Sequence, residues 1–264
     1  ARGIGAAVAQ RLASDGLQVA VIDLDESACA STVEAITSAG GKAIAVGADV
    51  SDEHATIALM DDVAARFGKL DAVVLNASGG MEKDLGEDYA MRLNRDAQVR
   101  ALETAAEALP QGGRVVFVTS HQAHFIREVE TMPEYEQVAL SKRAGEDALT
   151  ERIPMLSEKG IDFVVVSADM IEGTVTATLL NRARPGALDE RREAAGKLYT
   201  VHEFAQEIAA SGSSKRVTDT TGPNVSLRKQ VISSVTPDST ASMRSRAAGE
   251  NRAKPVPRPE RSHL

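Results

Sequence analysis

The sequence predicts a doubly wound α/β domain, in which helices cover both faces of a parallel β-sheet. Between residues 1 and 210, short runs of strand-forming residues alternate with longer segments of helical periodicity. The short runs are apolar throughout, as expected of strands that are buried on both faces. A chain of 264 residues is long enough to bury the core of such a domain.

The expected elements follow one another along the chain, after a first helix within residues 1–16. Strands are expected at 18–23, 42–50, 71–78, 113–120 and 161–169. Helices are expected at 26–41, 52–69, 86–109, 132–157 and 199–210. The segment Thr131-Met-Pro-Glu134 is interpreted as a capping box that starts the helix over 132–157. We expect right-handed crossovers between the strands.

The two ends of the chain depart from this pattern. The chain opens on ARGIGAAVAQRLASDG, the end of a glycine turn followed by a helix, so we interpret it as a fragment that lacks its first strand. Residues 212–264 contain ten basic and four acidic residues, a balance of +6 that leaves −14 for residues 1–211. We predict a domain over 1–211 and a basic, Ser- and Pro-rich, disordered tail over 212–264.

The composition argues against several classes of protein. The single cysteine, Cys29, excludes an internal disulfide and favours a reducing, cytoplasmic location. The sequence has no run of 18 apolar residues, so no membrane span is predicted. The tail has interspersed acids and no aromatic residues, so nucleic acid is not an expected partner. Cys29 and the pair His121/His124 lack the grouping of a metal site, so no metal is expected.

A short glycine motif points to a nucleotide. Gly3-Ile4-Gly5 precedes the first helix, where glycines let the backbone approach a phosphate and the helix N-terminus offers free N–H groups. Asp23 ends the next strand about 20 residues on, where an acid binds the ribose hydroxyls of NAD. Leu24 follows, with no cation for a 2′-phosphate, which favours NAD over NADP. Taken singly, these features also fit a tight turn and a helix N-cap region.

Further motif residues follow in order along the chain, each at or after the end of an expected strand or on an expected helix. They are Asp49-Val50, Asn76-Ala77 in LNAS, Asn94 in MRLNRDA, Ser120 in VVFVTS, Lys142 in SKRAG and Thr174 in IEGT. With the glycine turn, this ordered set resembles the short-chain dehydrogenase/reductase family over roughly residues 1–210.

The resemblance implies a Rossmann-like fold and NAD-dependent hydride transfer between an alcohol and a carbonyl of a small molecule. It places Asp49-Val50 beside the adenine and Asn76-Ala77 and Thr174 beside the cofactor. It implies that Ser120 binds the substrate oxygen, Lys142 holds the ribose and Asn94 supports a water relay. It also implies a homo-oligomer and a variable lid over 170–200.

The acid–base tyrosine departs from the family pattern. The family has Tyr and Lys four residues apart, but Val138 stands four before Lys142. The nearest tyrosine, Tyr135, lies seven before Lys142, on the same face of a helix but about 10 Å away along it. A late helix start or a bulge would bring Tyr135 to Ser120.

Two other interpretations of the site stay open. His121 or His124 could donate the proton, because histidine titrates near neutral pH. Alternatively, the chemistry is lost and the chain is a non-catalytic NAD-binding sensor or scaffold. The family also has Pro-Gly where this chain has Ser167-Ala168-Asp169, so the loop near the nicotinamide is expected to differ.

Overall fold

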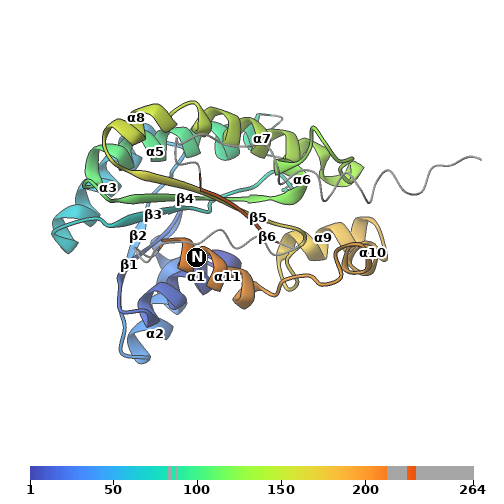
Figure 1. Ribbon diagram of the computed structural model, residues 1–264. Coiled ribbons are helices and arrows are strands. Elements are labelled where there is room, and N and C mark those ends of the chain that lie inside the picture. The colour runs from blue at the N-terminus through green and yellow to red at the C-terminus, as the bar shows by residue number, and fades with distance from the viewer. Residues whose placement is uncertain (83–84, 87, 213–224, 230–264) are drawn as a thin grey trace, which may run out of the picture. The chain divides into compact units, whose positions relative to one another are not determined.

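Parallel strands alternate with helices in the computed structural model, which describes residues 1–82, 85–86, 88–212 and 225–229 (Figure 1). The first half contains α1 (Gly3–Ser14), β1 (Gln18–Asp23), the 3₁₀ turn η1 (Glu26–Cys29), α2 (Ala30–Ser38), β2 (Lys42–Gly47), α3 (Glu53–Phe67), β3 (Ala72–Leu75), α4 (Tyr89–Met91), the π-helical turn η2 (Arg92–Asp96) and α5 (Ala97–Ala108). The second half contains β4 (Arg114–Ser120), α6 (His121–His124), the 3₁₀ turn η3 (Pro133–Tyr135), α7 (Glu136–Thr150), α8 (Ile153–Glu158), β5 (Asp162–Ala168), α9 (Val175–Ala183), α10 (Ala187–Ala195), α11 (Val201–Gly212) and β6 (Val225–Lys229).

The strands form two sheets rather than one. β1 and β2 pair in parallel, with Gln18 opposite Lys42. β3, β4 and β5 pair in parallel in that order, and β6 joins β5 antiparallel. Within the described residues, β1 and β3 each have no strand on their second edge. The fold is therefore the expected Rossmann-like α/β architecture, with a gap between β1 and β3.

Helices cover both faces of the strands, as Figure 1 shows: α3, α5, α7 and α8 lie on one face, and α1, α2 and α11 lie on the other. Successive residues of β4 and β5 therefore point into different helix layers. Val115 and Phe117 join the core under α5 and α8, while Val116 and Val164 join the core with α1 and α11. This two-sided burial explains why these strands are apolar at nearly every position.

Local signals set several element boundaries. Asp52 caps α3 by accepting a hydrogen bond from the backbone N–H of Ala55, and Gly68 ends the helix in a left-handed conformation with φ 75°. The helix expected over 132–157 is divided into η3, α7 and α8, and Pro154 lies in the first turn of α8. Proline has no backbone N–H and fits the first turn of a helix, so it favours a new start there.

The tail prediction needs a correction at β6. Residues 225–229 lie inside the segment 212–264 that was expected to be disordered, yet they form an edge strand on β5, with Val166 opposite Leu227. For these five residues the expectation is wrong, because VSLRK is too short and polar to give a clear strand signal on its own, and the edge of β5 supplies its hydrogen-bond partners. Gly212, the first residue of the predicted tail, ends α11, and residues 213–224 and 230–264 lie outside the described residues. Among the described helices, none has the length and hydropathy needed to span a membrane.

Candidate active site

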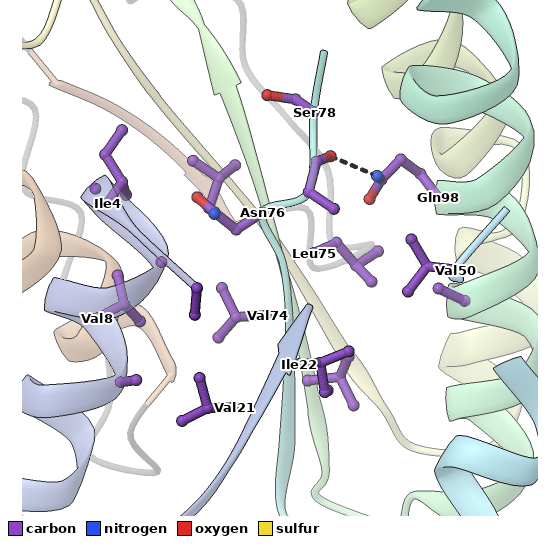
Figure 2. A pocket seen from close by; sticks show the side chains of 18 of the residues that line it. Ile4, Val8, Val21, Ile22, Val50, Val74, Leu75, Asn76, Ser78 and Gln98 are labelled. Carbon is purple, nitrogen blue, oxygen red and sulfur yellow. Dashed lines mark hydrogen bonds between the residues drawn. The ribbon is translucent and has the colours of Figure 1, made fainter. Parts of the chain in front are cut away.

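A large cavity connects the carboxyl ends of the strands with the gap between the two sheets. It has a volume of about 1870 Å³, and Tyr135, Ser120 and Asp23 all line it. Small-molecule pockets typically occupy about 300–1,000 Å³, so this cavity is larger than a ligand requires. Figure 2 shows why: Val21 and Val74 lie on the α1 side of the gap, and Ile22 and Leu75 lie on the opposite side. The cavity therefore includes both a site at the strand ends and the space between β1 and β3.

The glycine motif lies at the start of α1, at the edge of this cavity. Gly3 has φ +55°, a conformation that favours glycine. A Cβ on Gly5 would lie 3.0 Å from the Nδ2 atom of Asn76, so the turn and the loop after β3 approach closely. No side chain caps the N-terminus of α1, which leaves backbone N–H groups for an anion.

The next two predicted residues also line the cavity. Asp23 ends β1, and its Oδ1 accepts a hydrogen bond from the backbone N–H of Leu24. Gly3 and Gly5 of the glycine motif line the same cavity. Leu24 is 71% exposed. The glycine turn, Asp23 and Leu24 therefore line one continuous surface in the fold.

Asp49 and Val50 follow β2 and line the same cavity. The Asp49 carboxylate accepts hydrogen bonds from the Ser51 hydroxyl and backbone N–H at 2.6 Å and 2.8 Å, and these bonds lower its pKa. The ionised carboxylate therefore fixes the turn, which leaves Val50 as the apolar contact that Figure 2 shows in the cavity wall.

Asn76 and Ala77 lie in the loop that follows β3. A residue that the sequence reasoning missed anchors this loop: the Gln98 amide donates a hydrogen bond to the carbonyl oxygen of Ala77 at 2.7 Å, drawn in Figure 2. Gln98 is 3% exposed and lies four residues after Asn94. That helical spacing from a predicted site residue was the available signal.

Asn94 joins two parts of the site rather than facing the cavity. Its side chain donates to the carbonyl oxygen of Gly79 at 2.8 Å and to the hydroxyl of Ser141 at 2.9 Å, and it accepts from the backbone N–H of Gly79 at 3.1 Å. It is 2% exposed and, unlike the other predicted site residues, does not line the cavity. Asn94 thus ties the loop after β3 to the residue before Lys142, and its role in a water relay stays a prediction.

Tyr135 meets Ser120 because α7 starts late. Tyr135 is the last residue of η3, and the α-helix begins at Glu136. The Tyr135 hydroxyl lies 3.4 Å from the Oγ atom of Ser120, and Tyr135 is 5% exposed. Of the two geometries considered from the sequence, the structure has the late start.

The expected capping box is wrong, and its failure explains the late start. Met132, not Thr131, is the residue before η3, and it makes no side-chain cap. The Thr131 hydroxyl instead donates a hydrogen bond to the side-chain oxygen of Gln122. The long-range partner Gln122 outcompetes the local cap, which a sequence pattern cannot reveal.

Lys142 and Val138 both lie on the face of α7 that lines the cavity. Within the part of the chain that the structure describes, the Lys142 ammonium makes no hydrogen bond or ion pair, so it is available to a ligand. Val138 is 4% exposed, and its Cγ2 would lie 3.1 Å from a Cβ placed on Gly80. Valine therefore packs where the family has its tyrosine.

The lid segment contributes a capped helix and an ion pair. The Thr174 hydroxyl caps α9 by accepting from the backbone N–H of Ala177, and it donates to the carbonyl oxygen of Ile171. Asp169, at the end of β5, forms a two-fold ion pair with Arg191 of α10. The unexpected acid thus fixes the lid helix α10 to the sheet, a contact that the sequence analysis did not foresee.

Neither histidine lines the cavity that contains Ser120. Burial lowers the pKa of His121 to about 4, with smaller opposed effects of Asp169, which raises it, and of His124 and Arg191, which lower it. His124 lies 2.6 Å from Glu146 beside a second pocket of about 460 Å³. The geometry therefore favours Tyr135 over either histidine. In the described residues, no group of three His, Cys, Asp or Glu could hold a metal ion.

Comparison with known proteins gives consistent matches over most of the chain. Residues 1–224 match the model of a family described as enoyl-(acyl carrier protein) reductase. The short chain dehydrogenase/reductase AacuN of Aspergillus aculeatus is 33% identical over 219 residues, which is 80% of this chain and 78% of that protein. The 1-cyclohexenylcarbonyl-CoA reductase of Streptomyces collinus is 31% identical over 220 residues, 79% of this chain and 76% of that protein.

The fold has a solved counterpart as well. A short chain dehydrogenase from Burkholderia cenocepacia, crystallised in complex with NADP, superposes with a TM-score of 0.67 and 28% identity, covering 82% of this chain and 89% of that one. The family model, the curated relatives, the fold and the order of the cavity residues agree. This chain belongs to the short-chain dehydrogenase/reductase family.

Proposed function

We propose that this chain is an NAD-dependent oxidoreductase that transfers hydride between an alcohol and a carbonyl of a small molecule, with Tyr135 as the acid–base group. Membership of the family and relatives that are named reductases support an oxidoreductase of this type. The observation that carries the finer proposal is the 3.4 Å contact between the Tyr135 hydroxyl and Ser120, in one cavity with Lys142.

The residues at the strand ends fit a nicotinamide dinucleotide. The uncapped start of α1 and the close approach of Gly5 to Asn76 fit a pyrophosphate, and Asp23 fits the adenosine ribose. Lys142 fits the second ribose, because its ammonium is unpaired within the described residues and lines the cavity. When bound, the cofactor supplies or accepts the hydride.

The chain's own residues handle the substrate oxygen and the proton. In the reduction of a carbonyl, the Ser120 hydroxyl donates a hydrogen bond to the substrate oxygen and holds it beside Tyr135. The Tyr135 Oη atom then gives its proton to that oxygen as negative charge develops on it. In alcohol oxidation, the same oxygen atom of Tyr135 takes the proton. Val138 cannot exchange a proton, so its place on α7 contributes shape alone.

NAD is proposed over NADP on the basis of Asp23 and Leu24. A carboxylate at the end of β1 binds ribose hydroxyls and repels a 2′-phosphate, and the exposed Leu24 provides no compensating cation. The Burkholderia protein was crystallised with NADP, so members of the family differ in this respect. We also propose that the chain forms a homo-oligomer and that its substrate is a small-molecule alcohol or ketone.

The test is the oxidation of NADH with a panel of ketones and aldehydes, followed by absorbance. The Tyr135→Phe variant is expected to lower kcat about 10²–10⁴-fold, the usual contribution of general acid–base catalysis. Tyr199→Phe is the matched control, because Tyr199 does not line the cavity. Full activity of Tyr135→Phe would overturn the assignment of the proton donor, and binding of NADH without any turnover would favour a sensor or scaffold.

A further inference from the structure

The position of Tyr135 depends on a segment with few local constraints. Tyr135 ends the three-residue turn η3, so most of the hydrogen-bond ladder of α7 lies after it. No side chain caps η3. Arg127 to Glu130, which precede Thr131 and the buried Met132, are exposed. Something other than helix propensity must therefore fix where the turn begins.

Gln122 supplies that constraint. Its side-chain oxygen Oε1 accepts two hydrogen bonds, from the Thr131 hydroxyl at 2.8 Å and from the backbone N–H of Met132 at 2.9 Å. The carbonyl oxygen of Met132 in turn accepts from the backbone N–H of Tyr135 at 2.9 Å. One oxygen atom thus fixes Met132, the residue that directly precedes the turn on which Tyr135 lies.

Gln122 belongs to the short helix α6, which directly follows Ser120, the last residue of β4. Ser120 caps α6 by accepting a hydrogen bond from the backbone N–H of Ala123 at 3.3 Å, and Gln122 lies two residues after it. The hydrogen bonds therefore close a ring that runs from Ser120 through Gln122, Met132 and Tyr135 back to Ser120. Because Ser120 and Gln122 are two residues apart in the chain, the distance between the Ser120 and Tyr135 hydroxyl groups is set by a short local structure.

We propose that Gln122 is a positioning residue, whose side-chain oxygen holds the Tyr135 hydroxyl against Ser120 and so makes the seven-residue interval to Lys142 workable. The proposal rests on the proposed function for its effect on rate. Apolar burial also acts on Tyr135, since Met132, Val138 and Met170 belong to the same core cluster. Burial is non-directional, however, whereas the two hydrogen bonds of Gln122 fix a specific backbone position.

Three variants separate the acceptor oxygen from the rest of the side chain. Gln122→Met keeps the length but removes the acceptor. Gln122→Glu keeps an acceptor oxygen, loses the amide N–H groups and adds a negative charge. Thr131→Val removes one of the two donors and leaves the backbone N–H of Met132 in place.

We expect Gln122→Met to lower kcat about 10–100-fold with little change in KM, because a displacement of about 1 Å at a reacting group costs up to that much. Gln122→Glu should stay within about three-fold of wild type, and Thr131→Val should fall between the two, because it keeps one of the two hydrogen bonds. Affinity for NADH, measured by fluorescence, should not change in any of them, which also shows that the variants are folded.

A second measurement reports on Tyr135 without any turnover. Tetranitromethane nitrates accessible tyrosines, and the protein has three: Tyr135 is buried, while Tyr89 and Tyr199 are partly exposed. Peptide mass spectrometry of the full-length protein should show slow nitration of Tyr135 in wild type and in Gln122→Glu. In Gln122→Met, Tyr135 should react at a rate close to that of the other two.

The outcomes are distinguishable. Wild-type kcat and a protected Tyr135 in Gln122→Met would show that burial alone places the tyrosine and would overturn the proposal. A loss of kcat in Gln122→Glu as large as in Gln122→Met, with Tyr135 protected in both, would show that the side chain acts on the rate without holding Tyr135 in place, and it would also overturn the proposal. If wild type transfers no hydride, the proposed function fails, but the nitration pattern still tests the role of Gln122.

Discussion

Several site residues can be recognised in the sequence, but the residues that they contact are known only from the structure. Asp23 is visible because it ends an apolar strand, and the structure adds that it shares a cavity with the glycine motif. Asp169 can be recognised as a charged residue where the family has Pro-Gly, and in the structure it forms an ion pair with Arg191. Cofactor preference and the response of stability to pH are therefore expected to depend on single residues.

Cofactor preference should shift toward NADPH when Asp23, the last residue of β1, and Leu24, which follows it, are both changed. In Asp23→Ser/Leu24→Arg, the repulsion of a 2′-phosphate is removed and a cation is introduced beside it. We expect the ratio of kcat/KM for NADPH over NADH to rise at least about ten-fold, equivalent to about 1.4 kcal/mol. Leu17→Arg, which adds a cation at another exposed leucine, is the control. Tighter binding of NADPH than NADH by the wild type would contradict the role given to Asp23.

His121 should make the fold sensitive to acid. Burial lowers its pKa from 6.5 to about 4, so between these values the unfolded chain binds a proton that the folded chain does not. Stability from this group is complete above pH 6.5 and is lost as the pH falls toward 4. The expected loss between pH 7 and pH 5 is about 2 kcal/mol.

Urea denaturation at the two pH values measures this loss. The His121→Gln variant should be less sensitive to pH by that amount, while His202→Gln, which alters an exposed histidine, should behave as wild type. An unchanged pH dependence in His121→Gln would assign the acid sensitivity to other groups.

At the scale of elements, α7 and the π-helical turn η2 show how closely two helices must fit. A Cβ on Gly145 would lie 2.0 Å from the backbone oxygen of Asn94, a distance that no side-chain rotation relieves. Gly145 therefore allows α7 to rest directly on the turn that carries Asn94, and this contact sets the position of the helix that also carries Lys142.

Replacing Gly145 by alanine should destabilise the protein by at least about 3 kcal/mol, because backbone must move to admit the methyl group. Gly212→Ala is the control: Gly212 is the last residue of helix α11, and the nearest neighbours of an added Cβ would lie 3.9 Å away. Its effect should stay within about 1 kcal/mol, the difference in helix propensity. Thermal and urea unfolding measure both, and equal stabilities of the two variants would contradict the close fit.

The elements show where sequence reasoning succeeds and where it stops. Strands 18–23 and 113–120 were predicted nearly as found, because burial on both faces leaves an apolar run that needs no partner to be seen. The π-helical turn at Asn94 and the late start of α7 were not predicted as such, because each depends on a residue distant in sequence, Gly145 or Gln122. The late start was kept as an alternative only because Tyr135 and Ser120 are spaced as in the family.

At the scale of the whole molecule, the two sheets differ in how fully their strands are paired. β4 has a neighbour on both edges, whereas β2 has one within the described residues. A peptide group without a partner in the ladder opens to solvent more readily. The molecule should therefore be most protected at β4 and less protected at β2.

Hydrogen exchange followed by mass spectrometry tests this ranking. Amide groups of β4 should exchange most slowly, and those of β2 should exchange at least about ten-fold faster, as expected of groups that open locally. Addition of NADH should slow exchange at the glycine motif and at Asp23, because a bound ligand stabilises the closed state. Equal protection of β2 and β4 would contradict an open edge on β2.

The ion pair between Asp169 and Arg191 also bears on how the lid segment responds to temperature. The hydration of charged groups becomes less favourable on heating, so the cost of removing such a pair from water falls as the temperature rises. The attachment of α10 to the end of β5 is therefore expected to weaken less on heating than a contact made by apolar packing alone.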